Sequence, residues 1–199
     1  MIYFTSDCHL FHKRIIEYEP ITRPFNSVEE MNETIISNWN SVVKPDDEIY
    51  VLGDFIMGDI KNLEPTIKRL NGKITLVRGN HDTKSKLIEY QRLGIEVKDI
   101  AYIPYQGRFF ICCHFPITNE EFIRMVVEDN SEAVFLYGHT HSKSPKGYVN
   151  GTYHIGADTN NLTPISIEQI WEEAWPEEIM TEDIKAYKIA HALNPNLED

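Results

Sequence analysis

The chain has 199 residues and a formal net charge of −12 at pH 7, and this length is enough to bury the core of one ordinary domain. The acidic balance disfavours non-specific attraction to nucleic-acid phosphates or to an anionic membrane surface, so we expect no stable binding of duplex nucleic acid. Bound metal cations can reverse the potential of a site, and phosphate chemistry is therefore not excluded by the net charge.

The cysteines and the N-terminus indicate a cytoplasmic protein. Cys8, Cys112 and Cys113 are the three cysteines, too few for a disulfide framework, and we interpret them as reduced, buried packing residues. Residues 1–7 lack the basic and apolar regions of a secretion signal, and no stretch reaches the roughly 18 apolar residues needed to span a bilayer.

Predicted strands and helices alternate along the chain. Ser27 followed by Glu30 forms a capping box that opens a helix ending near Pro45. Short apolar runs predict strands at residues 2–6, 48–53, 73–78, 108–113 and 133–138, and further helices are predicted at 63–70, 83–93 and 120–128. This alternation indicates an α/β layered domain whose sheet is covered on both faces.

The last third of the chain contains a hairpin and a tail. Residues 147–156 predict a hairpin about Asn150-Gly151, a strong type I′ turn signal. From Ile165 onward, Pro176 divides two predicted helices, and the acidic residues there indicate a solvated face. We therefore expect one domain over residues 1–199 that includes a C-terminal helical tail over about 165–199.

Each predicted strand runs into a potential metal ligand. The strands are followed by Asp7, Asp54, Asn80 with His81, His114, and His139, in that order. Ligands of open α/β sheets bind outside the carboxyl ends of the strands, so these side chains are expected to converge. Asp7 with His9, and His139 with His141, lie two residues apart, a spacing that in extended chain sends both side chains to one side.

The candidate ligands mix carboxylate, amide and imidazole groups. Such oxygen and nitrogen donors suit Mn, Fe, Co, Ni or Zn. One tetrahedral ion cannot use them all, whereas two ions that share a carboxylate can, and two ions suit in-line phosphoryl displacement. The seven candidates are Asp7, His9, Asp54, Asn80, His114, His139 and His141.

Single motifs of this kind are weak evidence, because Asp-x-His pairs are usually surface or core residues and Gly-Asp is a common turn. The concentration of histidine is a stronger signal. Six of the eight histidines lie in these segments: His9, His12, His81, His114, His139 and His141. Chance is a poor account of that distribution.

The ordered motifs resemble a known family. Asp7-x-His9, Gly53-Asp54, Gly79-Asn80-His81-Asp82, His114 and Gly138-His139-x-His141 resemble the five signature blocks of the calcineurin-like metallophosphoesterases. The local pattern Phe4-x-x-Asp7-x-His9-x-x-His12, with Arg23-Pro24-Phe25, is similar to a small bacterial and phage-type branch. The resemblance implies a four-layer α/β/β/α sandwich with metals at the strand ends.

The resemblance also implies roles for individual residues. One ion would take Asp7, His9, Asp54 and His141, and the other would take Asp54, Asn80, His114 and His139, with Asp54 bridging. We expect two divalent transition-metal ions, with Mn favoured, and a hydroxide held between them that attacks phosphorus. His81 would be free of metal and would protonate the leaving oxygen. Asp82 either orients His81 or caps the next helix.

The sequence departs from the protein Ser/Thr phosphatases, which carry an acid-Arg-Gly continuation after Gly-Asp. Here Gly53-Asp54 is followed by Phe55-Ile56-Met57, so protein phosphatase activity is not expected. Candidate substrate-binding residues are Asn80, Arg23, Arg78 and His12, with Arg14 a weaker alternative; for each arginine a surface or salt-bridge role is the alternative.

The predicted function is a dinuclear metal-dependent phosphoesterase that hydrolyses a phosphodiester or phosphomonoester of a small or nucleotide-like substrate. One alternative is a non-catalytic metal-binding scaffold, which an eroded site would favour, but every ligand position and His81 are present. A second alternative is a nuclease on short or single-stranded nucleic acid.

Overall fold

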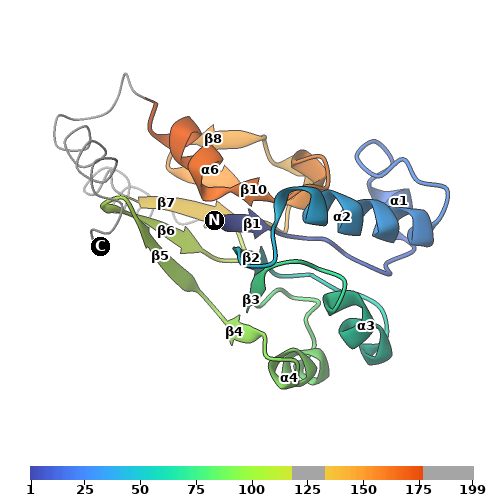
Figure 1. Cartoon of the computed structure of the whole chain (residues 1–199). Helices are drawn as coiled ribbons and strands as arrows, with labels where there is room; N and C mark the ends of the chain where they lie inside the picture. Colours follow the sequence, from blue (N-terminus) through green and yellow to red (C-terminus); the bar gives the residue numbers. More distant parts are fainter. Residues whose placement is uncertain (118–132, 177–199) are drawn as a thin grey trace.

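Two five-stranded sheets lie at the centre of the protein in the computed structural model, which describes residues 1–117 and 133–176 (Figure 1). The first sheet has the order β10-β1-β2-β3-β4. Its strands β1 (Ile2–Thr5), β2 (Glu48–Leu52), β3 (Lys73–Val77) and β4 (Glu96–Lys98) are parallel, and β10 (Ile165–Ser166) runs antiparallel to β1. The register pairs Thr5 with Val51 and Leu52 with Val77, so β1, β2 and β3 end at one edge of the sheet.

The second sheet has the order β5-β6-β7-β9-β8. Its strands are β5 (Ala101–Tyr105), β6 (Arg108–Cys112), β7 (Ala133–Tyr137), β8 (Gly147–Val149) and β9 (Thr152–His154). Strands β6, β7 and β9 are parallel, and β5 and β8 pair antiparallel with their neighbours. The predicted hairpin is confirmed: Asn150 (φ 46°) and Gly151 (φ 78°) join β8 to β9, and a type I′ turn needs positive φ at both positions.

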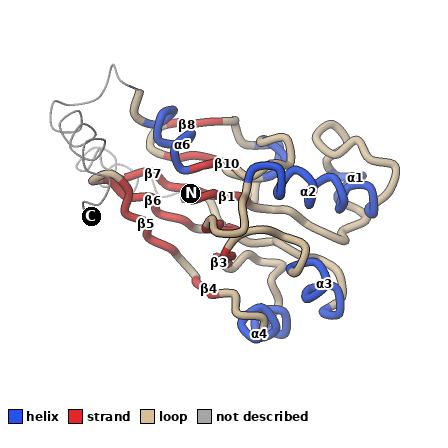
Figure 2. The backbone as a smooth tube through the Cα atoms, in the orientation of Figure 1, coloured by secondary structure: helices blue, strands red, loops and turns tan. Residues whose placement is uncertain are grey.

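Helices cover the outer face of the first sheet (Figures 1 and 2). They are α1 (Ile15–Tyr18), α2 (Val28–Val42), α3 (Leu63–Ile67) and α4 (Lys84–Arg92). The predicted cap of α2 is confirmed, because Ser27 Oγ accepts a hydrogen bond of 3.1 Å from the backbone N–H of Glu30. Helix α3 ends three residues before its predicted end, and it is preceded by a short 3₁₀ helix, η1 (Ile60–Asn62).

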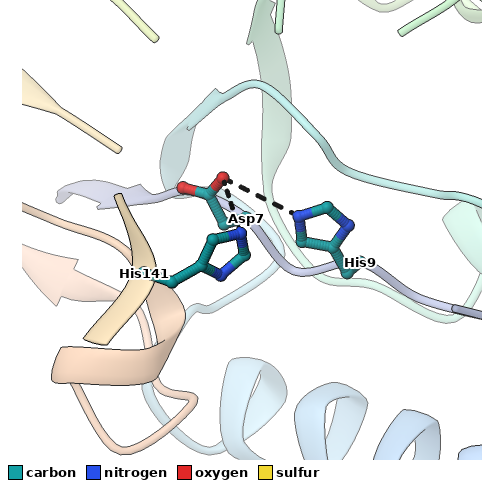
Figure 3. Close-up of side chains that lie close together, drawn as sticks. All are labelled: Asp7, His9 and His141. Atoms are coloured by element: carbon teal, nitrogen blue, oxygen red, sulfur yellow. Dashed lines mark ion pairs between the residues drawn. The ribbon is translucent and has the colours of Figure 1, made fainter. Parts of the chain in front are cut away.

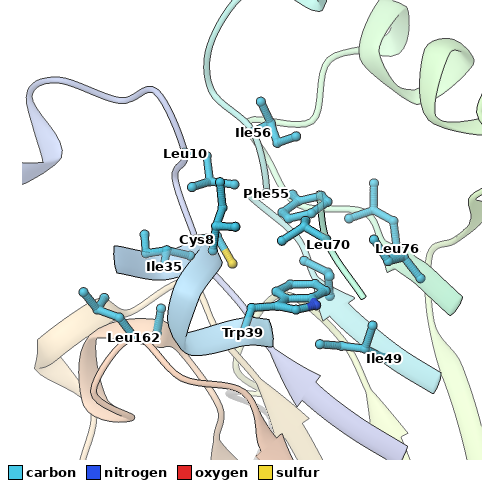
Figure 4. Packing of buried hydrophobic residues seen from close by; sticks show 14 of the residues in the cluster. Cys8, Leu10, Ile35, Trp39, Ile49, Phe55, Ile56, Leu70, Leu76 and Leu162 are labelled. Carbon is cyan, nitrogen blue, oxygen red and sulfur yellow. The ribbon is translucent and has the colours of Figure 1, made fainter. Parts of the chain in front are cut away.

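Alternation along the strands divides the core into two clusters. In the cluster under the helices, Phe55 stacks on Trp39 of α2, with ring centroids 5.8 Å apart (Figure 4). Phe55 also stacks on Tyr90 of α4, with ring centroids 6.0 Å apart. The second cluster lies between the sheets, where Phe4 of β1 packs on Phe110 of β6. Because β1, β2 and β3 each contribute residues to both clusters, their apolar runs are nearly continuous, as predicted.

Helix α6 (Ile167–Ala174) follows β10 and is the first predicted helix of the tail. Its Ile170 and Trp171 are buried in the cluster between the sheets, beside β8 and β10. The second tail helix and the helix predicted at 120–128 lie outside the described residues. The described layers of helix, sheet and sheet confirm the predicted α/β sandwich. Among the described helices, none has the length and apolar character needed to cross a membrane.

Candidate metal centre

Five strand ends from the two sheets meet at one place. The loop after β1 runs beside the loop after β2, with hydrogen bonds from Asp7 N to Gly53 O (3.1 Å) and from His9 N to Asp54 O (3.0 Å). Gly138, after β7, donates its N–H to His114 O, after β6 (3.0 Å). The two sheets are joined here as well, because Asp7 Oδ2 accepts a hydrogen bond of 2.8 Å from the backbone N–H of His139. The predicted convergence is therefore confirmed.

At five of the seven candidate ligands the backbone has positive φ and is not extended, so the prediction that extended chain turns Asp7 with His9, and His139 with His141, to one side is wrong. The φ values are 55° at Asp7, 49° at His9, 51° at Asp54, 67° at His139 and 50° at His141. Non-glycine residues rarely adopt positive φ, each costs of order 1–3 kcal/mol, and such residues gather at functional sites. The loops turn sharply to bring these side chains inward.

Asp7, His9 and His141 form the first group that could hold a metal ion (Figure 3). His9 Nε2 lies 3.8 Å and His141 Nε2 lies 4.0 Å from Asp7 Oδ1. Asp7 and His9 are buried, and the side chain of His141 is partly exposed. The three donor atoms face a common point from loops that are far apart in the sequence.

Asp54 lies between this group and a second one. Its Oδ2 is 3.7 Å from His9 Nε2 and 3.6 Å from His114 Nε2, and Asp7, Asp54 and His114 form another group that could hold an ion. Around His114, Nε2 is 2.8 Å from Asn80 Oδ1 and 3.2 Å from His139 Nδ1. The structure thus brings all seven candidate ligands together.

Hydrogen bonding on the far side of the rings fixes which nitrogen faces inward. His114 Nδ1 lies 2.7 Å from the carbonyl oxygen of Leu52, which only accepts, so Nδ1 carries a proton and Nε2 is the ring nitrogen that faces Asn80 Oδ1. In the neutral ring, Nε2 and Asn80 Oδ1 are two acceptors that face each other, and a cation near both stabilises this arrangement. Asp7 Oδ1 and His9 Nε2 are also buried, and neither has a hydrogen-bond partner within residues 1–117 and 133–176. These donor atoms fit bound cations.

Burial sets the protonation of this cluster. It lowers the pKa of His9 to about 2, with neighbouring cationic groups acting in the same direction, so the imidazole is neutral and can coordinate a metal. Burial also raises the pKa of Asp7, against the opposing effects of His114 and His141. A buried carboxylate beside the neutral imidazole of His9 gains most from a cation in direct contact.

Arg23 is not a substrate-binding residue, and that prediction is corrected. Its side chain is 0% exposed and forms a two-pronged ion pair with Asp158, with Nε 2.7 Å from Oδ1 and Nη2 3.0 Å from Oδ2. It also donates to the backbone carbonyls of Cys8 (2.9 Å) and Asp7 (2.6 Å). A guanidinium group that is buried and fully paired is not available to bind a phosphate. It holds the loop that carries Asp7 and His9.

Asp158, in the 3₁₀ helix η3 (Ala157–Thr159), was not predicted. Its Oδ2 accepts from His141 Nδ1 at 2.7 Å, which directs His141 Nε2 toward Asp7. Burial by itself lowers the pKa of His141, but the hydrogen bond to Asp158 and the negative charges of Asp7 and Asp158 together raise it. The sequence offered only Gly-Ala-Asp after the hairpin, which is an ordinary turn signal.

Asp82 has neither of its two predicted roles. Its Oδ2 accepts the backbone N–H groups of Asp54 and Gly79, both at 2.9 Å, so it links the loops after β2 and β3. Helix α4 begins after Thr83, which occupies the N-cap position. Asp82 therefore positions the backbone of the candidate ligand Asp54.

Three further predicted site residues surround the ligands. His81 donates its backbone N–H to Asp54 Oδ1 (2.8 Å), while its side chain is 48% exposed with Nε2 4.0 Å from Asp54 Oδ2. The ring of His12 is 5.3 Å from that of His9. Arg78 is exposed and its Nη2 lies 3.1 Å from Asp99 Oδ1.

Cys8 and Cys112 are buried as predicted, but Cys113 is partly exposed.

Buried carboxylate and imidazole groups at strand ends of an α/β sandwich define a protein with a candidate metal centre. The sequence model of the calcineurin-like phosphoesterase superfamily domain matches residues 1–155. The chain belongs to this superfamily, whose members are metal-dependent. The predicted family is thereby confirmed.

Three relatives illustrate the similarity. An uncharacterized protein of Methanocaldococcus jannaschii is 34% identical over 176 residues, which cover 85% of this chain and 88% of that protein. The gene 66 protein of Mycobacterium phage L5 is 36% identical over 83 residues, 40% of this chain and 39% of that protein. The crystal structure of a protein of unknown function from Aquifex aeolicus has a TM-score of 0.68 at 28% identity and covers 86% of this chain and 98% of its own.

Proposed function

We propose that the protein is a phosphoesterase that uses two divalent metal ions. The observation that carries the proposal is the position of Asp54. Its buried Oδ2 lies 3.7 Å from His9 Nε2 and 3.6 Å from His114 Nε2, so one carboxylate oxygen is adjacent to two imidazole donors that belong to different groups. A carboxylate in this position can bridge two neighbouring ions, the arrangement that suits in-line phosphoryl displacement.

The contacts support the proposed ligand assignment. One ion would be held by Asp7, His9 and His141, the other by Asn80, His114 and His139, and Asp54 would serve both. When bound, the ions acidify a water molecule and neutralise charge on the phosphoryl oxygens. Imidazole nitrogen and oxygen donors suit Mn, Fe, Co, Ni or Zn, with Mn favoured as a test ion.

His81 is proposed as the general acid. Its backbone is tied to Asp54 by a hydrogen bond, and its ring is 48% exposed, so Nε2 can reach the leaving oxygen of a substrate held at the ligand cluster. A proton held at Nε2 passes to that oxygen as the ester bond breaks. Arg78, His12 and Asn80 are proposed to contact the substrate, since each lies at the exposed border of the cluster.

The test compares two histidine variants. Purified protein reconstituted with Mn²⁺ is assayed on 4-nitrophenyl phosphodiester and monoester substrates, with metal content measured in the same sample. His81→Ala is expected to keep about two ions per chain and to lose about 10²–10⁴-fold in kcat. His114→Ala is expected to lose metal and activity together, because His114 touches Asp54, Asn80 and His139.

Each alternative outcome identifies a different error. Unchanged turnover in His81→Ala would remove the proposed acid. Stoichiometric metal without hydrolysis of either ester in the wild-type protein would favour the scaffold, and hydrolysis of short single-stranded nucleic acid alone would favour the nuclease.

A further inference from the structure

A cavity of about 390 Å³ opens beside the metal centre, between the loops after β3 and β6. Asn80, a candidate ligand, forms part of its wall, together with Arg78, Asp99 and Phe115. The volume falls within the range of small-molecule sites. A phosphoryl group bound at the ligand cluster would therefore have this cavity as its immediate neighbour.

Ring contacts place the cavity and His81 at different parts of the cluster. The ring of Phe115 lies 4.9 Å from the rings of both His114 and His139. The ring of His81 instead lies 5.7 Å from that of His9. A leaving group protonated by His81 and a second organic group in the cavity would thus not compete for space. This separation suits a phosphodiester, which has two organic arms, because a monoester has only one.

The side chains at the cavity match a planar heteroaromatic group. Phe115 is 46% exposed and offers an aromatic surface directly beside the ligand histidines. The guanidinium group of Arg78 and the carboxylate of Asp99 lie 3.1 Å apart, both exposed, and present a donor next to an acceptor. A nucleobase combines a ring that stacks on aromatic side chains with donors and acceptors along its edge.

We propose that the cavity binds the base of a nucleoside phosphodiester, on the arm that stays attached to phosphorus when the leaving group departs. The inference rests on the proposed phosphoesterase function and names its substrate class. Phe115 provides the stacking surface, and Arg78 with Asp99 contacts the edge of the base.

Two substrates with the same leaving group test the proposal: thymidine 5′-(4-nitrophenyl) phosphate and methyl 4-nitrophenyl phosphate. With Mn²⁺-loaded protein, kcat/KM is expected to be at least about tenfold higher for the nucleoside diester, as expected for one base stacked on an aromatic ring. Phe115→Ala is expected to remove this preference mainly through KM and to leave the methyl diester and the metal content unchanged. The matched control is Phe109→Ala, because Phe109 is also 46% exposed but lies on β6.

A binding measurement complements turnover. Thymidine 5′-phosphate is expected to raise the Tm of the Mn²⁺-loaded wild-type protein more than methyl phosphate does, and Phe115→Ala should abolish the difference. Arg78→Met should weaken the nucleotide effect several-fold, whereas Arg92→Met, which alters another exposed arginine paired with carboxylates, should not.

The failures are distinguishable. If both diesters are cleaved equally well and both phosphates shift Tm equally, the base subsite is wrong and the phosphoesterase function stands. If Phe115→Ala slows both diesters alike or lowers the metal content, Phe115 supports the ligand histidines and binds no base. If the wild-type protein cleaves neither diester, the proposed function is wrong and the subsite falls with it.

Discussion

Asp158→Asn is expected to weaken both the fold and the metal centre. The carboxylate of Asp158 accepts from Arg23 Nε (2.7 Å) and Nη2 (3.0 Å), from His141 Nδ1 (2.7 Å) and from Thr22 Oγ1 (2.8 Å). The amide removes the negative charge and turns an NH₂ group toward at least one of these donors, at nearly constant volume. Arg23 would then be a buried cation without its counter-charge.

The size of the effect follows from burial. The side chains of Arg23 and Asp158 are both 0% exposed, and breaking a buried ion pair by changing one partner costs about 3–5 kcal/mol. The same substitution removes the anionic acceptor of His141. Loss of such a partner behind a metal-bound histidine lowers metal affinity about 10–100-fold.

Two assays separate these effects. Chemical denaturation of metal-free protein measures the free energy of unfolding, and calorimetric titration with Mn²⁺ at a temperature where both proteins are folded measures affinity. Glu33→Gln is the matched control, because Glu33 also pairs in two-pronged fashion with an arginine, Arg69 (2.8 and 2.5 Å), but both side chains are exposed. The control is expected to lose less than about 1 kcal/mol.

Both proposed roles of Asp158 would be wrong if Asp158→Asn lost no more stability than Glu33→Gln and bound Mn²⁺ with wild-type affinity. Lost stability with unchanged affinity would leave Asp158 as a purely structural residue. In that case His141 would be oriented by its backbone alone.

Further predictions concern a close approach of glycine and a buried histidine. Gly53→Ala should destabilise the metal-free protein by about 2 kcal/mol more than Gly94→Ala in urea denaturation. Both glycines have positive φ, but a Cβ at Gly53 would lie 2.5 Å from Gly79 Cα, whereas a Cβ at Gly94 meets nothing within 4 Å. Equal losses of stability in the two variants would contradict the packing argument. Burial lowers the pKa of His154 from its ordinary 6.5 to about 4. As the pH falls below 6.5, the unfolded state therefore binds a proton that the folded state does not, and the free energy of unfolding should drop by about 3 kcal/mol by pH 4. His154→Asn should flatten this pH dependence of the metal-free protein by one proton, and an unchanged slope would show that His154 does not cause it.

The sequence by itself determined the identity of the candidate metal ligands and of the strands that carry them. Each strand is a local apolar run, and the polar residue that follows it is adjacent in the chain, so Asp54 after β2 and His114 after β6 could be predicted without any tertiary contact. The hairpin at Asn150-Gly151 and the cap at Ser27 were predictable for the same reason, since their conformations depend on neighbours within a few residues.

Only the tertiary structure decided which residues hold the candidate ligands in position. Arg23, predicted to bind substrate, pairs with Asp158, a residue 135 positions away, and nothing near either residue in the sequence indicates the other. Asp82 likewise bonds to the backbone of Asp54 across two loops. Whether a charged side chain faces solvent or another charge depends on which loops pack together, because burial removes the water that would otherwise solvate it.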